Sequence, residues 1–415
     1  MIYVEKNVIV NEIGLAILIK TQHGDMTAMT AIHTRQHPWR QGGVRFAVNA
    51  NEIELAHLAL GMTEKALAAD IPIDGMKCLV VCPGGVPAAA QDRAKILADH
   101  IKLVKEVEPN AVFGPDMNCQ EDVLDIVYAD HGLKKSVTGL SKHNGGLEID
   151  KNGFTAIGVF EAIETATELM ANNLSTASIQ GFGAVGAHLA GLLQLANYSV
   201  VAISNIDGCL AALNGELDVV ASSPENCGRT FRDFDQLKTT YQEIGHVFFD
   251  ARPERLFNCR ADIVTLAART SVLARENELS NARKENKDVV AVEAMYEAVR
   301  PMLIVEAANH PLSEAAERFL SDRDVVILPD ILINCGGMIG CWYEYKHRET
   351  LITKNTTFDH ALERCLDYTR NIIKKNVREL LVNKFETKDF ERAAVNKLIA
   401  SRRGQIGVSN TDFIK

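Results

Sequence analysis

The spacing of apolar residues changes along the chain, and each change predicts a different kind of structure. Near the N-terminus, short apolar runs such as 15–19 alternate with polar turns, which predicts the strands of a sheet. Residues 51–69 carry apolar side chains at helical spacing, and Lys65 falls in the C-terminal half of this helix. Pro72, Asp74 and Gly75 then predict a break that leaves Lys77 on a loop before a buried strand, 78–82.

The second half of the chain alternates helices with short apolar strands. A glycine-rich polar stretch at 130–155 precedes a predicted helix from Ala156 to about Asn172, and beyond Gly337 the chain is charged and helical. Strands are predicted at 176–180, 199–204, 262–266, 302–306 and 325–328, with a further helix from Val185. Such alternation is typical of a parallel, doubly wound sheet.

We therefore predict an α/β protein with two domains. The first covers residues 1–145 and is an α/β domain, the second covers residues 146–340 and carries the doubly wound sheet, and residues 341–415 are helical.

Composition narrows the class of function. The 415 residues are 47% hydrophobic and 24% charged, as in an enzyme-sized globular protein, and the net charge of −10 argues against nucleic acid or an anionic membrane as partner. No apolar run reaches the roughly 18 residues of a membrane span, and no signal-peptide pattern is present, so we expect a cytoplasmic location. The nine cysteines form no CxxC pair and the twelve histidines no zinc motif, so no metal is expected.

A glycine-rich segment between a predicted strand and a predicted helix indicates a dinucleotide site. It is formed by Gly181, Phe182, Gly183, Ala184, Val185 and Gly186, and its glycines let a pyrophosphate approach the helix N-terminus. Asn205 stands where a carboxylate would bind the ribose hydroxyls of NAD, and no Lys or Arg lies within 199–215. NAD and NADP both remain open, with a lean toward NAD.

Two lysines and an aspartate predict a site for an amino acid. Lys65 and Lys77 lie twelve positions apart, and Asp116 follows in Gly-Pro-Asp-Met-Asn. One ammonium group can hold a substrate carboxylate, and a desolvated second lysine can act as a base.

These segments resemble those of the glutamate/leucine/phenylalanine/valine dehydrogenase family, from Gly42 to about Glu344. Gly42-Gly43-Val44-Arg45-Phe46 is similar to the segment beside the substrate carboxylate, and Met62-Thr63-Glu64-Lys65 to the motif whose lysine binds that carboxylate. Gly75-Met76-Lys77 resembles the segment of the catalytic lysine, and Gly114–Asn118 the one whose aspartate moves the amine proton. Later segments resemble those that line the nicotinamide, and they contain Thr155, Ala267, Ala268, Asn309 and Asn334.

The resemblance implies a homo-oligomeric enzyme for reversible NAD(P)-dependent oxidative deamination of an L-amino acid to a 2-oxo acid and ammonia. It also implies that residues 1–145 serve substrate binding and oligomerisation, that residues 146–340 form a Rossmann-type dinucleotide-binding domain, and that the helices of residues 341–415 return to pack on the first domain. Lys77 would be the base and Asp116 the proton shuttle. Glutamate-specific members carry a lysine and a serine where this chain has Gln41 and Cys341, so we expect a neutral substrate and a place nearer the leucine/phenylalanine/valine branch. The expected substrate contacts are Gln41, Gly42, Gly43, Lys65, Asn118, Met338 and Cys341.

Departures from the family pattern leave alternatives open. Asp74 replaces a glycine three residues before Lys77, and it could either pair with that lysine or point to solvent. Residues 146–150 also lack the arginine that is common there in the family. Asp74, Asn205 and this stretch motivate a second hypothesis, a catalytically silent homologue that binds nucleotide or amino acid as a regulatory protein. A dehydrogenase of 2-hydroxy acids is a third, but no histidine stands at a motif position to polarise a carbonyl.

Overall fold

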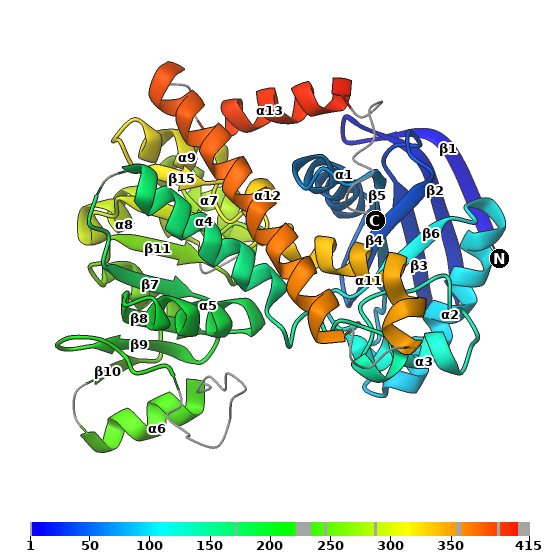
Figure 1. The fold of residues 1–415 in the computed structure, drawn as a ribbon, viewed down its shortest axis with the longest axis horizontal. Helices are drawn as coiled ribbons and strands as arrows, with labels where there is room; N and C mark the ends of the chain where they lie inside the picture. Colours follow the sequence, from blue (N-terminus) through cyan, green and yellow to red (C-terminus); the bar gives the residue numbers. More distant parts are fainter. Residues whose placement is uncertain are drawn as a thin grey trace. The chain divides into compact units, whose positions relative to one another are not determined.

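The computed structural model describes residues 2–170, 172–220, 234–244, 247–285, 289–353, 358–387 and 391–405. Contacts divide the chain into two units, shown in Figure 1. The described parts of 1–152, 337–368 and 399–415 form the first unit, and those of 153–336 and 369–398 form the second. No described helix is long and apolar enough to cross a membrane.

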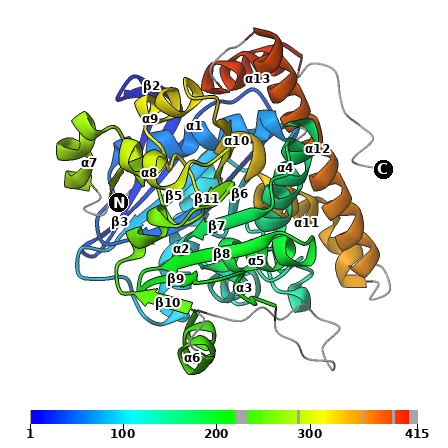
Figure 2. The same ribbon diagram turned by 90° about the vertical axis from the view of Figure 1, so that its left-hand side faces the viewer.

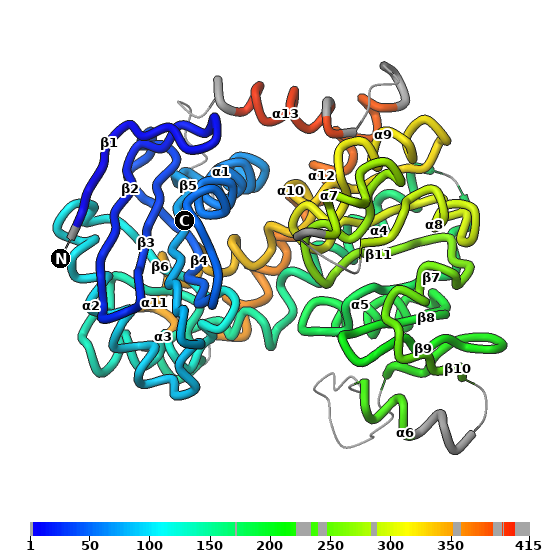
Figure 3. Tube along the Cα trace, turned by 180° about the vertical axis from the view of Figure 1, so that it is seen from behind, coloured from blue at the N-terminus to red at the C-terminus, as the bar shows by residue number. Residues whose placement is uncertain are grey.

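The first unit contains a six-stranded mixed sheet, which confirms the strands predicted near the N-terminus. In spatial order the strands are β1 (Ile2–Val10), β2 (Ile13–His23), β3 (Met26–Ile32), β5 (Ile73–Val81), β4 (Trp39–Ala47) and β6 (Ala111–Gly114). The first four pair antiparallel, and Figure 3 shows β1, β2 and β3 side by side. The last three, β5, β4 and β6, are parallel neighbours.

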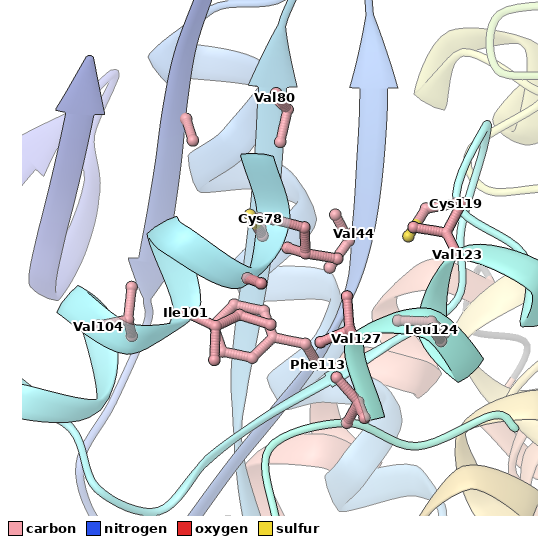
Figure 4. Close-up of a cluster of buried hydrophobic side chains, with 14 of the residues drawn as sticks. Val44, Cys78, Val80, Ile101, Val104, Phe113, Cys119, Val123, Leu124 and Val127 are labelled. Atoms are coloured by element: carbon pink, nitrogen blue, oxygen red, sulfur yellow. The ribbon is translucent and has the colours of Figure 1, made fainter. Parts of the chain in front are cut away.

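Helices cover both faces of this sheet. α1 (Glu52–Ala68) packs on one face, and its N-terminus is capped by Asn51, whose side chain accepts a hydrogen bond from the Glu54 amide. α2 (Ala90–Val107) and α3 (Glu121–Ala129) cover the other face over a buried apolar layer that includes Val44, Cys78 and Phe113 (Figure 4). The short 3-10 helix η1 (Lys142–Asn144) follows.

Lys77 lies inside β5, so its predicted position on a loop was wrong. The strand already begins at Ile73, because Asp74 and Gly75 pair with Arg40 and Gln41 of β4. Gly75 has no side chain, so α1 can approach β5 closely here. The Gly75 amide donates a hydrogen bond to Thr63 Oγ1 of α1 at 3.0 Å. Aspartate and glycine are uncommon inside strands. Here Gly75 is needed for the close approach of α1, and hydrogen bonds satisfy the Asp74 carboxylate, so both residues remain inside β5.

The second unit is built on a seven-stranded sheet, seen in Figure 2. Its order is β10 (Val247–Asp250), β9 (Gly208–Ala212), β8 (Ser199–Asn205), β7 (Thr176–Gln180), β11 (Ile263–Leu266), β14 (Leu303–Glu306) and β15 (Val326–Leu328). The strands from β8 to β15 are parallel and confirm the predicted ones. The antiparallel β9 and β10 were not predicted.

Helices and short elements complete the second unit. α4 (Phe154–Met170) and α5 (Ala184–Leu195) match two predicted helices, except that residue 171 lies outside the described residues. The others are α6 (Phe234–Ile244), η2 (Pro253–Asn258), β12 (Leu273–Ala274), η3 (Glu276–Glu278), α7 (Leu279–Glu285), β13 (Val290–Ala291), α8 (Val292–Val299), α9 (Glu314–Ser321) and α10 (Asp330–Ile333).

The C-terminal helices are shared between the two units, whereas we expected all of them on the first domain. They are α11 (Gly336–Thr353), α12 (Phe358–Thr387) and α13 (Glu391–Gln405); residues 406–415 of the predicted helical stretch lie outside the described residues. From Thr369 to Leu398 the chain belongs to the second unit. There α12 packs on α4, beside which it runs in Figure 1. Lys374 of α12 pairs with Glu161 of α4 at 3.0 Å.

We predict that Gly75→Ala destabilises the first unit. A Cβ at this position would lie 2.2 Å from the Thr63 amide nitrogen and 2.4 Å from the Ala59 carbonyl oxygen, both backbone atoms of α1. The cost should be about 1–3 kcal/mol, measured as a lower urea midpoint by circular dichroism. Gly61→Ala in the middle of α1 is the control, because its Cβ meets nothing within 4 Å and should stabilise by about 0.5–1 kcal/mol. Equal effects of the two variants would contradict the close packing.

Candidate active site

The alternation of side chains along parallel strands places several predicted site residues on one face of the first sheet, whereas Gly42, next to Met76 and level with Phe113, belongs to the other face. Val44, Met76 and Cys78 belong to the layer under α2 and α3. The residues between them therefore face the other way. On that opposite face lie Gln41, Gly43 and Arg45 of β4, Gly75 and Lys77 of β5, and Gly114 of β6, which is the register partner of Gly43.

Lys77 forms a buried ion pair with Asp116, which follows β6. Its Nζ lies 2.5 Å from Asp116 Oδ2, and Lys77 is 7% exposed. Arg45 approaches the same oxygen at 3.2 Å and is itself paired with Glu54 at 2.8 Å. Burial alone would raise the pKa of Asp116, but Lys77 and Arg45 outweigh it and lower that pKa to about 2. Asp116 is therefore a carboxylate at neutral pH.

Glycine at position 43 makes room for this pair. A Cβ there would lie 2.7 Å from the Pro115 carbonyl oxygen and 3.2 Å from Lys77 Nζ. The turn that carries Asp116 is closed by Asn118, which has a φ of 60° and donates from Nδ2 to the Phe46 carbonyl at 2.9 Å. The structure thus gives Asn118 a role in holding the backbone around Asp116. Lys65 is half-buried in the last turn of α1.

The residues expected around the substrate side chain also come together in the first unit. Gln41 is 2% exposed and donates from Nε2 to the Met338 carbonyl at 3.4 Å, which sets the orientation of its amide. Its Oε1 is buried and accepts no hydrogen bond from the described residues. Cys341 Sγ lies 3.8 Å from where a Cβ on Gly114 would be. Gln41 thus presents one unsatisfied acceptor in this part of the first unit.

Glu344 fixes the loop beside this region, and nothing in the sequence singled it out. Its buried carboxylate accepts hydrogen bonds from the amides of Gly139 and Leu147 at 2.8 and 3.0 Å, and it pairs with Arg348 at 3.0 Å. Burial raises the pKa of Glu344, although Arg348 and the backbone donors oppose that shift. Its backbone partners lie about two hundred positions away in sequence, so only the fold brings them together.

A cavity of about 740 Å³ opens at the glycine-rich segment of the second unit. Gly181 has a φ of 96°, and a Cβ on it would lie 2.5 Å from the Ala268 nitrogen. Gly183 is the N-cap of α5 and provides no side-chain cap, which leaves the first amides of the helix for an anion. Gly186 packs against the Gly181 carbonyl, where a Cβ would be only 1.9 Å away. Each glycine thus has the role that a pyrophosphate-binding turn requires.

The remaining predicted cofactor residues lie at neighbouring strand ends of the same unit. Ala267, after β11, donates to the Gln180 carbonyl at 2.7 Å. Asn334 donates from Nδ2 to the Ala307 carbonyl and to Asn309 Oδ1, at 3.2 and 3.3 Å, while its own buried Oδ1 has no partner among the described residues. Gly336 packs against the N-terminal turn of α4, which contains Thr155. An unsatisfied acceptor of this kind fits a carboxamide group.

Sequence comparison decides the family. The profile of the Glutamate/Leucine/Phenylalanine/Valine dehydrogenase family matches residues 145–401, more than half of the chain. The protein belongs to this family. The NAD-specific glutamate dehydrogenase A of Halobacterium salinarum is 25% identical over 353 residues, which cover 80% of this chain and 72% of that protein. An NAD-specific glutamate dehydrogenase of Staphylococcus aureus is 24% identical over 337 residues, covering 79% and 71%.

Solved structures share the fold. A hetero-hexameric glutamate dehydrogenase from Thermus thermophilus, in a leucine-bound form, aligns with 97% of this chain and 88% of its own at 20% identity and a TM-score of 0.69. The L-tryptophan dehydrogenase from Nostoc punctiforme aligns with 94% and 95% at 17% identity and a TM-score of 0.61. Membership of the family named above makes the protein an amino acid dehydrogenase, which is an oxidoreductase. Since the sequence relatives named above are glutamate dehydrogenases, they do not support the expected place nearer the leucine/phenylalanine/valine branch.

Both sequence-based expectations for Asp74 in this dehydrogenase were wrong. Asp74 is fully buried, so it does not point to solvent, and it lies on the opposite face of β5 from Lys77. Its carboxylate accepts hydrogen bonds from Thr34 Oγ1 at 2.5 Å and from the amides of Gln36 and His37 at 3.0 and 2.8 Å. Asp74 and Lys77 are three positions apart, and in a strand such a spacing places two side chains on opposite faces. The sequence did not show this, because β5 was not expected to begin as early as Ile73.

Several site residues were missed. Arg45 contacts Asp116 and could have been found from the sequence, because it is two positions after Gly43 on one strand and so shares its face. Pro253, Glu254, Phe257 and Arg269 line the cavity of the second unit, and no local pattern marks them.

We predict that Asp74→Asn destabilises the dehydrogenase in a pH-dependent way. Burial by itself would raise the pKa of Asp74, but hydrogen bonds from His37, Thr34 and Gln36 hold it below its usual 3.8. A lowered carboxyl pKa stabilises the fold above the usual value, and this contribution is lost as pH falls through the folded pKa. The variant should therefore lose about 2 kcal/mol at pH 7 and progressively less below pH 4, measured by urea unfolding.

Asp99→Asn is the matched control. Asp99 pairs with Lys102 at 3.6 Å on the surface, where such pairs contribute at most about 1 kcal/mol. If Asp74→Asn were no more destabilising than Asp99→Asn at neutral pH, the inferred role of the buried carboxylate would be excluded.

Proposed function

We propose that this enzyme catalyses reversible, NAD-dependent oxidative deamination of a neutral L-amino acid to a 2-oxo acid and ammonia. The observation that carries the proposal is the buried Lys77–Asp116 pair, whose Nζ and Oδ2 are 2.5 Å apart. An amine and a carboxylate at hydrogen-bond distance can move protons between substrate, water and each other. Family membership supplies the reaction class.

The roles of the residues follow from their chemistry. Lys65 binds the substrate carboxylate, and Asp116 accepts a proton from the substrate amine. NAD, when bound, supplies the acceptor for the hydride that leaves the α-carbon. Lys77 then takes a proton from the water molecule that adds to the iminium carbon, and Asp116 returns a proton to the departing ammonia. Arg45 keeps Asp116 ionised and in place through the 3.2 Å contact.

The second unit has the features that a dinucleotide needs. The cavity is lined by Gly181 and Gly183 at the α5 N-terminus, and Asn334 adds a buried acceptor without a described partner. We favour NAD, because two relatives are named as NAD-specific and no basic residue lies within 199–215 to bind a 2′-phosphate.

A neutral substrate side chain is supported by Gln41 itself. Its buried amide carries no charge, and it stands where glutamate-specific members of the family carry a lysine. A substrate carboxylate placed against Gln41 Oε1 would be buried without a counter-charge, which is costly, whereas an N–H or O–H group would satisfy this acceptor. We therefore keep the neutral, aliphatic or aromatic substrate of the leucine/phenylalanine/valine branch as our proposal, although the named sequence relatives act on glutamate.

A homo-oligomer is also part of the proposal. The similarity to the Thermus thermophilus protein, which is described as hetero-hexameric, supports an oligomer, and the family resemblance implies that its subunits are identical.

We predict that the enzyme deaminates neutral L-amino acids with NAD and that Lys77→Ala lowers kcat by about 10²–10⁴-fold, the usual contribution of a general base. A panel of amino acids with both cofactors, and of 2-oxo acids with ammonia in the reverse direction, measures this by NADH absorbance. NADH affinity of the variant should stay unchanged.

Lys77→Arg is the control for the charge. It keeps a cation beside Asp116 but cannot act as a base at neutral pH, so it should be as inactive as Lys77→Ala. Wild-type turnover in either variant would remove Lys77 from the mechanism. If the unaltered enzyme binds NADH yet turns over no member of the panel, the catalytically silent homologue becomes the better description.

We predict that Gln41→Lys gives the enzyme activity on glutamate. An ammonium group at this buried position would pair with the substrate side-chain carboxylate, and a charged hydrogen bond of about 1.5–3 kcal/mol corresponds to a gain of about 10–100-fold in kcat/KM. Gln41→Leu is the matched control, which should leave activity on glutamate low. A lysine variant with unchanged preference would place the substrate side chain elsewhere.

A further inference from the structure

We propose that Glu254 selects NAD over NADP and takes the place of the carboxylate that is missing after β8. This inference rests on the proposed function, because it requires a dinucleotide in the cavity of the second unit.

The position after β8 offers no carboxylate to the cavity. Asn205 lines the cavity, but both polar atoms of its side chain are engaged. Its Oδ1 accepts from the Asp207 amide at 2.8 Å, and its Nδ2 donates to Asp207 Oδ2 at 3.2 Å. These bonds close the turn between β8 and β9, and Asp207 is not among the residues that line the cavity. Asn205 is therefore poorly suited to choose between ribose hydroxyls and a 2′-phosphate.

Glu254 brings an acidic group to the same cavity from a segment about fifty positions later in the sequence. Among the described residues that line the cavity, it is the only acidic one. It lies on η2, which packs against β9, β8 and β7, with Leu256 and Phe257 buried in the core of the unit. Just before η2, Arg252 bonds both carboxylate oxygens of Asp250, at 2.9 and 2.7 Å. The backbone that carries Glu254 is thus held at the β8 side of the cavity.

Among the described residues that line the cavity, the single basic one lies on the side opposite to Glu254. Arg269 follows β11, and the sheet order places β7 between β8 and β11. Two strand spacings separate the ends of β8 and β11 by about 10 Å. Arg269 is therefore suited to the pyrophosphate, which NAD and NADP share, whereas Glu254 lies nearer the end of β8, where the adenosine ribose of such a fold binds.

Charge then decides the choice of cofactor. A 2′-phosphate carries up to two negative charges, and a carboxylate in the same partly enclosed cavity repels it. The same carboxylate can accept hydrogen bonds from the ribose hydroxyls of NAD. Repulsion against one ligand combined with attraction to the other is how specificity is usually built.

Equilibrium titration of the full-length protein with NADH and NADPH, without amino acid, tests the inference. The unaltered protein should bind NADH at least about tenfold more tightly, and Glu254→Gln should reduce that ratio about tenfold, mainly through tighter NADPH binding. Glu254→Asp keeps the charge and should keep the preference. Arg269→Gln is the matched control, which should weaken both nucleotides by a similar factor. Added salt should shrink the difference between the unaltered protein and Glu254→Gln.

The outcomes separate this inference from the proposed function. An unchanged ratio in Glu254→Gln, or an unaltered protein that prefers NADPH, overturns the role of Glu254 but leaves oxidative deamination standing. A protein that binds neither nucleotide overturns both. Loss of the preference in Glu254→Gln with retention in Glu254→Asp supports the inference, whatever the amino acid substrate proves to be.

Discussion

Two charged residues buried within one strand constrain the first unit more than any other feature. Asp74 is fully buried and Lys77 is 7% exposed, and both lie in β5. A buried charge is tolerated only with partners, and an odd spacing places these two on opposite faces. Asp74 is satisfied by the 34–37 segment and Lys77 by Asp116. A slip of β5 by one residue would exchange the two faces and leave both charges without partners, so the pair specifies the register of the strand.

The second unit uses buried charge in a similar way. Arg392 of α13 pairs with Glu306, Glu317 and Asp330, at 3.1, 2.6 and 3.3 Å. Burial raises the pKa of Glu306, although Arg392 opposes the shift. Because three carboxylates converge on one guanidinium, this part of α13 is required by the second unit. Asp330 begins the short helix that leads to Asn334, so the same cluster positions a proposed cofactor residue.

Family membership and substrate chemistry rest on different parts of this chain. The family profile matches residues 145–401, whereas Lys65, Lys77 and Asp116 all precede that range. The relatives named as glutamate dehydrogenases share the overall sequence at 24–25% identity, whereas the proposed choice of substrate rests on a few side chains such as Gln41 and Cys341. A likeness in fold extends to an L-tryptophan dehydrogenase as well. Family membership therefore gives the reaction class, and we propose that the local charge around the substrate side chain decides the substrate.

The sequence by itself determined the parts whose signals are local. Apolar periodicity located the parallel strands β7, β8, β11, β14 and β15, and the glycines at 181, 183 and 186 indicated the dinucleotide site, since each follows from neighbouring residues. The tertiary structure alone decided what depends on partners distant in sequence. It placed Lys77 inside a strand, turned Asp74 to the opposite face, gave Asp116 its contact with Arg45, and brought Glu254 to the cavity beside Asn205. These outcomes depend on strand register and long-range hydrogen bonds, which no stretch of neighbouring residues contains.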